Sequence, residues 1–377
     1  MARVAIEYSP ALLQVGGVGR SVREMTAALL HSAKHAYTLM TSGLPAPHFP
    51  PNLHAPRRNI PLPDRLLTRL WHRAGVAFPA ALFTRGFDLF FATNFALPPL
   101  PRGMRTAVFV HDLTYLHAAE AAVPSLIAYL SSVVPRAVTT ADVVVVNSLS
   151  TKRDLVSAYD VDPQRIHAVQ FGVGAQFGPI EAELARRTAA RYGLGGSPFV
   201  FAVGTLQPRK NYSRLIEAVA ILRHSGQDVQ LAIAGPEGWM MDDLRRDAES
   251  ASSQFVRLLG KVPDSDLPAL YNAALCFAMP SLYEGYGLPV LEAMACGAPV
   301  VTSNVSSLPE AAGGAALLVD PRDVSALADA LGQLMTNPEL RAGLSARGLE
   351  RVHGHTWART AVDLEAAFDF ALANPRA

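Results

Sequence analysis

Short apolar runs alternate with segments of helical periodicity along the whole chain. Runs that predict buried strands lie at residues 3–8, 37–40, 87–92, 106–110, 143–146, 165–171, 199–203, 229–234, 255–259, 274–279, 299–302 and 315–319. Apolar residues recur at helical spacing in residues 18–32, 126–140, 150–159, 212–224 and 324–335, and a last helix begins at Trp357. This alternation predicts an α/β protein with doubly wound parallel sheets.

The series of strands and helices occurs twice, with a break in composition between the two. Residues 172–179 contain three glycines and a proline and separate the two series. A chain of 377 residues is also too long for one comfortable core. We therefore expect two Rossmann-like domains that face each other across a cleft, with residues 1–175 in the first and residues 176–356 in the second.

Three stretches of the first half lack strand periodicity. Residues 9–17 are expected to form a loop, and residues 43–63, which contain seven prolines, an irregular surface region. Residues 64–73 read as a helix with Leu66, Leu67, Leu70 and Trp71 on one face and Arg65, Arg69 and Arg73 on the other. Such a basic amphipathic helix can lie on an anionic membrane, or can place its apolar face on the core, and both interpretations stay open.

Charge and cysteine usage narrow the class of protein. The net charge is only +1, which gives no indication of nucleic-acid binding. Residues 1–175 nevertheless contain 16 Lys and Arg against 10 Asp and Glu, and residues 176–377 contain 17 against 22. A basic first half favours an anionic acceptor or a membrane surface, or reflects an uneven spread of surface charge.

Targeting and metal signals are missing from the sequence. The two cysteines, Cys276 and Cys296, lie in apolar surroundings and form neither a disulfide framework nor a zinc motif. A strand begins at Arg3, so we expect no signal peptide, and no run of about 20 apolar residues predicts a membrane span. These features favour a reducing, cytoplasmic compartment and a protein that needs no metal.

The most informative stretch is a strand, glycine turn and helix at residues 274–297. The turn contains Gly285 and Gly287, and Pro289 suits a first helical position. The backbone N–H groups of Gly287 and Leu288 should therefore form an anion site at the helix start.

Two glutamates flank this expected anion site. Glu284 lies in the turn and Glu292 in the first turns of the helix. An ionised carboxylate only accepts hydrogen bonds, so its natural partner is a hydroxyl group. A ligand with a phosphate between two hydroxyl-rich rings, a nucleotide-sugar, fits this arrangement. Alternatively, Glu284 is solvated and Glu292 only favours the helix N-terminus.

A basic pair follows the strand at residues 199–203. The chain has four lysines, at positions 34, 152, 210 and 261, and Lys210 lies beside Arg209 in the turn. Two cations at the end of a strand suit a clamp on a diphosphate. The alternative is a solvated helix start, where positive charge is unfavourable without an anion.

The first half also has candidate residues at strand ends. Gly16 and Gly17 belong to the turn Gly-Gly-Val-Gly after the first strand, where the backbone can approach a phosphate. A dinucleotide fingerprint would need a further glycine and an acidic residue after the second strand, and no P-loop motif is found. His111 and Asp112 end one strand, and Ser148 ends another. Asp112 can either orient the His111 ring or cap the segment that follows, and Ser148 can cap the next helix.

These motifs together resemble glycosyltransferases of family 4, which are retaining enzymes with the GT-B fold. The resemblance is carried by Glu284-Gly285-Tyr286-Gly287-Leu288-Pro289, by residues 292–301, by Leu308-Pro309-Glu310, by Asp320-Pro321, by Pro208-Arg209-Lys210-Asn211 and by Phe109-Val110-His111-Asp112. It implies that the last helix, residues 357–377, packs back on the first, acceptor-side domain, and that the second domain binds a nucleotide-sugar donor.

The resemblance also implies roles for single residues. Lys210, Arg209, Gly17 and the N–H groups of Gly287 and Leu288 would bind the diphosphate. Glu284 would hold the sugar hydroxyls, Glu292 the ribose, and His111 would face the transferred sugar. The remaining positions that would line the donor site or the cleft wall are Gly16, Gly204, Thr205, Val262, Gly285, Tyr286, Asp112 and Ser148. Many members have an arginine where this chain has Thr205, so either Arg209 replaces that arginine or Lys210 acts alone.

The implied reaction is transfer of a sugar from a nucleoside-diphosphate-sugar to a hydroxyl of a glycan or lipid-linked acceptor, without a metal. The motif variant is most similar to polysaccharide mannosyltransferases that use GDP-mannose. A UDP-sugar-dependent transferase, a sugar-nucleotide epimerase of the same fold and a non-catalytic nucleotide-sugar binder are the alternatives. A nicotinamide dehydrogenase is disfavoured.

Overall fold

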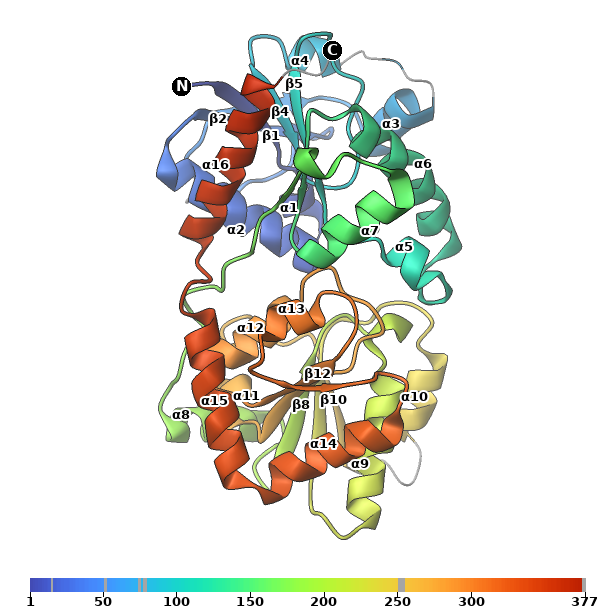
Figure 1. Ribbon diagram of the computed structural model, residues 1–377, viewed down its shortest axis with the longest axis vertical. Helices are drawn as coiled ribbons and strands as arrows, with labels where there is room; N and C mark the ends of the chain where they lie inside the picture. The colour runs from blue at the N-terminus through green and yellow to red at the C-terminus, as the bar shows by residue number, and fades with distance from the viewer. Residues whose placement is uncertain (15, 51–52, 74–75, 77–79, 250–254, 375–377) are drawn as a thin grey trace. The chain divides into compact units, whose positions relative to one another are not determined.

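The computed structural model of the protein describes residues 1–14, 16–50, 53–73, 76, 80–249 and 255–374 (Figure 1). Contacts divide the chain into two units. The first comprises residues 1–115, 124–172 and 356–377, and the second comprises residues 116–123 and 173–355. Residues 116–123, which the sequence analysis assigned to the first domain, thus belong to the second unit.

The first unit is built on a seven-stranded parallel sheet in the order β3-β2-β1-β4-β5-β6-β7. Its strands are β1 (Arg3–Glu7), β2 (Ala36–Ser42), β3 (Arg57–Ile60), β4 (Leu89–Ala92), β5 (Arg105–Val110), β6 (Val143–Val146) and β7 (Ile166–Ala168). Its helices are α1 (Ser9–Leu13), α2 (Gly17–Ser32), α3 (Asp64–Thr68), α4 (Ala80–Phe83), α5 (Thr114–His117), α6 (Pro124–Thr140), α7 (Leu149–Tyr159) and α16 (Trp357–Ala373). The chain order reverses between β1 and β4, where such sheets bind ligands.

Helices cover both faces of this sheet. The ring of Phe91 in β4 packs against Phe368 of α16, with ring centroids 5.0 Å apart, and α16 also packs along α2. The neighbouring residue Phe90 points to the opposite face, where it joins a buried cluster with Val133 and Val134 of α6. At the connection to the second unit, a Cβ on Gly172 would lie 2.2 Å from the backbone nitrogen of Trp357, so only glycine fits where the two segments cross.

The second unit contains a six-stranded parallel sheet in the order β10-β9-β8-β11-β12-β13. Its strands are β8 (Phe199–Val203), β9 (Gln230–Ala234), β10 (Val256–Gly260), β11 (Cys276–Met279), β12 (Val300–Ser303) and β13 (Leu317–Val319). Its helices are α8 (Ala182–Arg191), α9 (Tyr212–His224), α10 (Asp242–Glu249), α11 (Leu267–Ala273), α12 (Leu288–Ala295), α13 (Leu308–Ala312), α14 (Val324–Thr336) and α15 (Pro338–Val352). The two sheets confirm the predicted α/β class.

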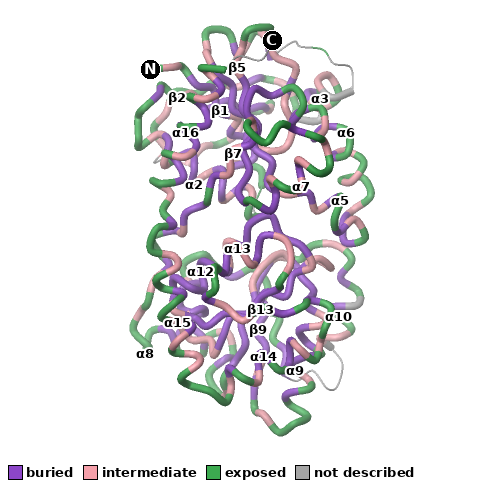
Figure 2. Tube along the Cα trace, viewed as in Figure 1, coloured by how far each residue is buried: buried purple, intermediate pink, exposed green. Residues whose placement is uncertain are grey.

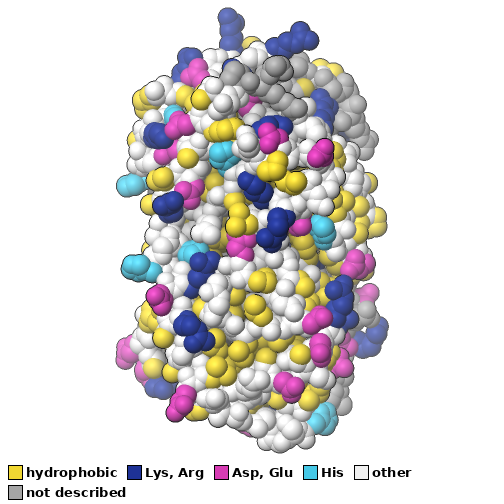
Figure 3. All heavy atoms as spheres, viewed as in Figure 1, with side chains coloured by type: hydrophobic (Ala, Val, Ile, Leu, Met, Phe, Trp, Pro, Cys, Tyr) yellow, Lys and Arg dark blue, Asp and Glu magenta, His cyan; other side chains and the backbone are white. Residues whose placement is uncertain are grey.

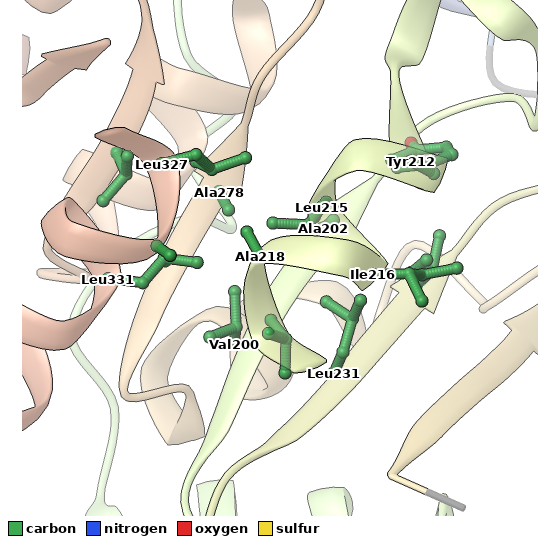
Figure 4. Packing of buried hydrophobic residues seen from close by; sticks show 14 of the residues in the cluster. Val200, Ala202, Tyr212, Leu215, Ile216, Ala218, Leu231, Ala278, Leu327 and Leu331 are labelled. Carbon is green, nitrogen blue, oxygen red and sulfur yellow. The ribbon is translucent and has the colours of Figure 1, made fainter. Parts of the chain in front are cut away.

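The core of the second unit lies on both faces of its sheet. Figure 4 shows Val200 of β8 packed with residues of α9 and α14, among them Leu215, Ala218 and Leu331. On the other face the ring of Tyr271 in α11 packs edge-on against Phe201 and Phe277. In both units the buried residues follow the strands, and the outer sides of the helices are exposed (Figure 2).

Three details differ from the sequence prediction. The expected loop at residues 9–17 contains α1, whose five residues are too few to show a helical period. The expected irregular region 43–63 contains β3, an edge strand in which only Ile60 is buried, so it has no apolar pattern. The helix expected at residues 64–73 is α3 followed by a π-helical turn, and its apolar residues differ in environment: Leu67 is fully buried and Leu66 is 42% exposed.

Candidate functional site

The turn after β8 positions the side chains of Arg209 and Lys210. Gly204 adopts a φ of +148°, and a Cβ there would lie 2.9 Å from Cε of Lys210, so glycine leaves room for the lysine side chain. After a short 3-10 turn, Asn211 adopts a φ of 60° and donates from Nδ2 to the carbonyl oxygens of Pro280, at 2.9 Å, and Pro321, at 2.6 Å. These bonds tie the turn to the segments that follow β11 and β13, and so fix the two cations in place.

Glu284 lies between the two cations. Its Oε2 is 2.7 Å from Nη1 of Arg209, and its Oε1 is 2.7 Å from Nζ of Lys210. All three side chains are largely buried, with exposures of 10% for Glu284, 13% for Arg209 and 9% for Lys210. Burial alone would raise the pKa of Glu284, but attraction to Arg209 and Lys210 outweighs it and lowers the pKa to about 2. The carboxyl group is therefore ionised at neutral pH and accepts hydrogen bonds only.

The backbone around Glu284 is held by neighbouring polar groups. The N–H of Glu284 donates to Oγ of Ser306 at 2.9 Å, and Oγ of Ser307 donates to the carbonyl of Glu284 at 2.8 Å. Nη1 of Arg209 also donates to the carbonyl of Tyr283 at 2.6 Å. Ser306, Ser307 and Tyr283 were not among the predicted site residues. Two adjacent serines just before the Leu-Pro-Glu segment were the available signal.

The expected anion site is the start of α12. Gly287 is the N-cap with a φ of +103°, and a Cβ there would meet Leu308 Cδ2 at 3.0 Å, so the turn requires glycine. The helix begins at Leu288, one residue earlier than predicted, and Pro289 lies within its first two positions. Gly285 and Tyr286, between Glu284 and the helix, are buried.

Glu292 lies in α12 and is also buried. Its Oε2 accepts a hydrogen bond of 3.2 Å from the hydroxyl of Tyr271, a residue of α11 that the sequence analysis did not assign to the site. Val262 is buried in the loop after β10, and Thr205 is half-buried in the loop after β8. The structure thus brings Arg209, Lys210 and Glu284 into contact, and gives Glu292 a hydroxyl as its partner.

The remaining candidates belong to the first unit. Gly16 is the N-cap of α2 and Gly17 its first residue, and a Cβ on either would meet no atom within 4 Å. A Cβ on Gly19, by contrast, would lie 1.9 Å from the carbonyl oxygen of Gln14. Of the three glycines in this turn, Gly19 is therefore required by packing, while Gly16 and Gly17 leave open space.

His111 is buried in an aromatic cluster. Its ring stacks on Phe109, with centroids 4.5 Å apart, and packs edge-on against Phe95. Burial lowers the pKa of His111 to about 4, so the ring is neutral at pH 7. Its Nε2 lies 2.8 Å from the carbonyl oxygen of Thr93; because a carbonyl only accepts, Nε2 carries the proton.

Asp112 and Ser148 both act as caps in the structure. Oδ1 of Asp112 accepts from the N–H of Thr114 at 2.9 Å, at the start of α5. Oγ of Ser148, which is fully buried, accepts from the N–H of Thr151 at 3.0 Å as the N-cap of α7. For both residues the structure contains the capping interaction that the sequence analysis left as one of two alternatives.

The two units together define the class of protein. They form a GT-B fold, the two-domain architecture of many glycosyltransferases. A solved structure of sucrose-phosphate synthase from Thermosynechococcus elongatus has the same fold, with a TM-score of 0.77 and 22% sequence identity over 99% of this chain and 100% of that one. This likeness establishes the fold.

Sequence comparisons then give the family. Glycosyltransferase Family 4 matches residues 15–177, and Glycosyl transferases group 1 matches residues 187–351. The chain is 32% identical over 271 residues to O-antigen chain mannosyltransferase B of Escherichia coli, covering 71% of each. It is 36% identical over 244 residues to D-inositol 3-phosphate glycosyltransferase of Corynebacterium glutamicum (strain R), covering 62% of this chain and 58% of that one. The chain belongs to glycosyltransferase family 4, as the resemblance predicted.

The described part of the chain contains neither a metal-binding cluster nor a membrane-spanning helix. No group of three or more His, Cys, Asp and Glu residues there is arranged to hold a metal ion. None of the helices described has both the length and the apolar character needed to cross a membrane.

Proposed function

We propose that this glycosyltransferase moves mannose from GDP-mannose to a hydroxyl group of a glycan or lipid-linked acceptor, with retention of configuration. The observation that carries the proposal is the buried trio of Arg209, Lys210 and Glu284 at the carboxyl edge of the second sheet. The choice of mannose is supported by the similarity to an O-antigen chain mannosyltransferase. The similarity to a D-inositol 3-phosphate glycosyltransferase leaves other donors as outcomes of the test.

In this proposal the two cations and the carboxylate of the trio bind different parts of the donor. Arg209 and Lys210 bind the diphosphate, because cations in a largely buried site form strong charge-assisted bonds to phosphate oxygens. Glu284 accepts hydrogen bonds from the hydroxyls of the transferred sugar, and Glu292 from those of the ribose. The start of α12 adds the partial positive charge of a helix N-terminus.

The proposed reaction proceeds on one face of the sugar. The acceptor oxygen forms a bond to the anomeric carbon as the bond from that carbon to the diphosphate oxygen breaks. The proton of the acceptor hydroxyl passes to the departing diphosphate. No protein nucleophile is needed, and catalysis comes from stabilising the phosphate as it gains charge, which is the task of Arg209 and Lys210. His111 would face the sugar as a neutral ring, and no step in this scheme calls for a metal.

Membrane contact is a further part of the proposal. Arg69 and Leu66 are both exposed beside the buried Leu67, so residues 64–73 still present basic and apolar groups to solvent. We propose that this segment contacts an anionic membrane from the cytoplasmic side. Co-sedimentation with anionic and neutral vesicles would test it, and equal binding to both would contradict it.

The first experiment identifies the donor. Because a ligand that binds only the native state stabilises it, GDP-mannose should raise the melting temperature more than UDP-, ADP- or other GDP-sugars. A larger effect from a UDP-sugar would contradict the mannose proposal but not the transferase family. Product formed without an acceptor would indicate an epimerase, and NMR of the product's anomeric proton would show whether configuration is retained.

The second experiment tests the site. Lys210→Ala should lose most turnover with GDP-mannose, because the departing diphosphate loses a buried counter-charge. Lys261→Ala, which removes an exposed lysine of the same unit, is the matched control and should retain turnover. Equal transferase rates in the two variants would refute the proposed site.

A further inference from the structure

One short segment of the chain departs from the unit that its neighbours in sequence form. Residues 116–123 belong to the second unit, whereas the chain up to Tyr115 and from Pro124 onward belongs to the first. The segment contains the end of α5 and a 3-10 turn, Ala119–Ala121. Its contacts therefore lie in the unit that contains the proposed donor site.

The 116–123 segment is held in the second unit by apolar, aromatic and polar contacts. Ala118 and Ala121 are buried in one cluster with Tyr283. The ring of His117 stacks on that of Tyr283, with centroids 5.2 Å apart and an angle of 13° between the ring planes. Nε1 of Trp239 donates to the carbonyl oxygen of Ala121 at 2.9 Å. The stacked rings and the hydrogen bond both require a defined geometry, so they fix where the segment lies.

Trp239 donates this hydrogen bond from a loop that is itself tied down. The loop follows β9, and the carbonyl of Pro236 in it accepts from the N–H of Leu206 at 3.0 Å. A Cβ on Gly238 would lie 2.2 Å from the carbonyl oxygen of Leu206, so only glycine allows this close approach. The hydrogen bond to the 116–123 segment thus comes from a loop joined to the turn after β8, the turn that carries the basic pair.

Tyr283 connects the 116–123 segment to the trio of Arg209, Lys210 and Glu284. Its carbonyl oxygen accepts a hydrogen bond of 2.6 Å from Nη1 of Arg209, the atom that also pairs with Glu284. The N–H of Leu282 donates in turn to the carbonyl of Arg209 at 2.9 Å. The position of Arg209 therefore depends on the backbone of residues 282–284, and this backbone carries the ring on which the segment packs.

We propose that the 116–123 segment is a positioning element of the proposed donor site. By packing on Tyr283 it holds the backbone of residues 282–284, and so keeps Arg209 in place for a diphosphate. His117 is a positioning residue that acts through its stacked ring, and Trp239 fixes the segment through its hydrogen bond. Electrostatic stabilisation of a leaving group depends on charges that are in place beforehand, which gives this positioning its value. The inference rests on the proposed function for the identity of the ligand.

Hydrogen exchange in the ligand-free protein tests the positioning without any substrate. The amides of Leu282 and Glu284 each donate a hydrogen bond and report on the backbone beside Tyr283. His117→Ala removes the stacked ring and should speed their exchange by about threefold to tenfold, while amides in β9 keep their rates. His117→Phe keeps an aromatic ring and should restore the original rates. Trp239→Phe removes the donor but keeps a ring, and should speed exchange of the same two amides.

The exchange rates separate local positioning from general stability. Histidine side chains also reach the surface elsewhere in the second unit (Figure 3). His353→Ala, at an exposed histidine of this unit, is the matched control and should leave every rate unchanged. Thermal unfolding would verify that each variant is folded. Unchanged rates at Leu282 and Glu284 in His117→Ala, equal acceleration that includes β9, or no recovery in His117→Phe would each overturn the proposal.

Turnover measures the consequence for catalysis. With GDP-mannose as donor, His117→Ala should lower kcat by about threefold to tenfold, and the KM for the acceptor should not change. His117→Phe should restore kcat, which a role of His117 in proton transfer would not allow, because a phenyl ring has no titratable group. Unchanged kcat in His117→Ala would overturn the positioning role. Absence of turnover with any donor in the unaltered protein would refute the proposed function, and the exchange test would still decide the positioning.

Discussion

Replacing Glu284 by glutamine tests the electrostatics of the proposed donor site directly. The substitution keeps the size and shape of the side chain but removes its charge. Arg209 and Lys210, whose side chains are only 13% and 9% exposed, would then be two neighbouring buried cations without their shared anion. We expect the ligand-free second unit to be clearly less stable at pH 7, because an uncompensated buried charge is strongly destabilising.

The size of this loss of stability follows from the lowered pKa of Glu284. The two cations lower the pKa of Glu284 from 4.5 to about 2. Each tenfold change in proton affinity is worth about 1.4 kcal/mol, so the ionised form is stabilised in the folded state by about 3 kcal/mol. Since the folded pKa lies below the unfolded one, this contribution is present above pH 4.5 and is lost as the pH falls toward 2. Glu284→Gln should therefore lower the unfolding free energy by about 3 kcal/mol at pH 7 and by little near pH 2.

Unfolding in urea would be monitored through hydrogen exchange of the backbone amides in β8 and β11. These amides report the stability of the second unit alone. The matched control is Glu237→Gln, because Glu237 also lies 2.7 Å from an arginine, Arg245, but is 68% exposed. An exposed pair contributes less than about 1 kcal/mol, so the control should change little. Equal stabilities of Glu284→Gln and the control at pH 7 would refute the claim that the trio is a buried, coupled site.

Three further predictions concern the first unit. In an NMR titration, His111 should have its midpoint near pH 4, and a midpoint near 6.5 would contradict its burial. Because the pKa of His111 is lower in the folded state than in the unfolded state, the buried neutral ring adds stability above pH 6.5, and this stability is lost as the pH falls toward 4. Gly19→Ala should destabilise by about 1–3 kcal/mol in thermal unfolding, since its Cβ would overlap the carbonyl of Gln14, whereas Gly16→Ala should change little; equal effects would contradict the packing argument. Ser148→Ala should cost about 1 kcal/mol in urea unfolding through loss of the cap of α7, and an unchanged midpoint would exclude that role.

The buried strands could be predicted from sequence because they are continuous apolar runs between turn signals. β8 has the bounds that its apolar run predicted, and each of its first four residues is buried. β3 was missed because an edge strand buries only one side, and its sequence Arg-Arg-Asn-Ile looks polar. α15 has only Leu344 and Gly348 buried, so it shows no apolar stripe to read.

The positions of Arg209, Lys210 and Glu284 at strand ends could be predicted, but their contacts with one another could not. Arg209, Lys210 and Glu284 each follow a strand that the sequence predicts, and carboxyl ends of neighbouring parallel strands meet at one edge. The sequence suggested phosphate as the partner of the two cations and hydroxyl groups as the partner of Glu284, but it did not predict that these residues contact one another. That contact joins residues about 74 positions apart and depends on the φ of Asn211 and the hydrogen bonds of Ser306 and Ser307, none of which periodicity reveals.

The ion pairs need not break for the proposed donor to bind at this site. Lys210 has three donor hydrogens and Arg209 has five, while each carboxylate oxygen of Glu284 engages one cation and has a further lone pair. Phosphate oxygens can therefore approach the two cations while sugar hydroxyls donate to Glu284. The trio carries a net charge of +1, so a diphosphate is attracted to it even though a carboxylate is present. Because the cations are already held in place before the donor arrives, the proposed site does not have to reorganise as charge develops on the leaving diphosphate, which is the condition under which electrostatic stabilisation accelerates a reaction most.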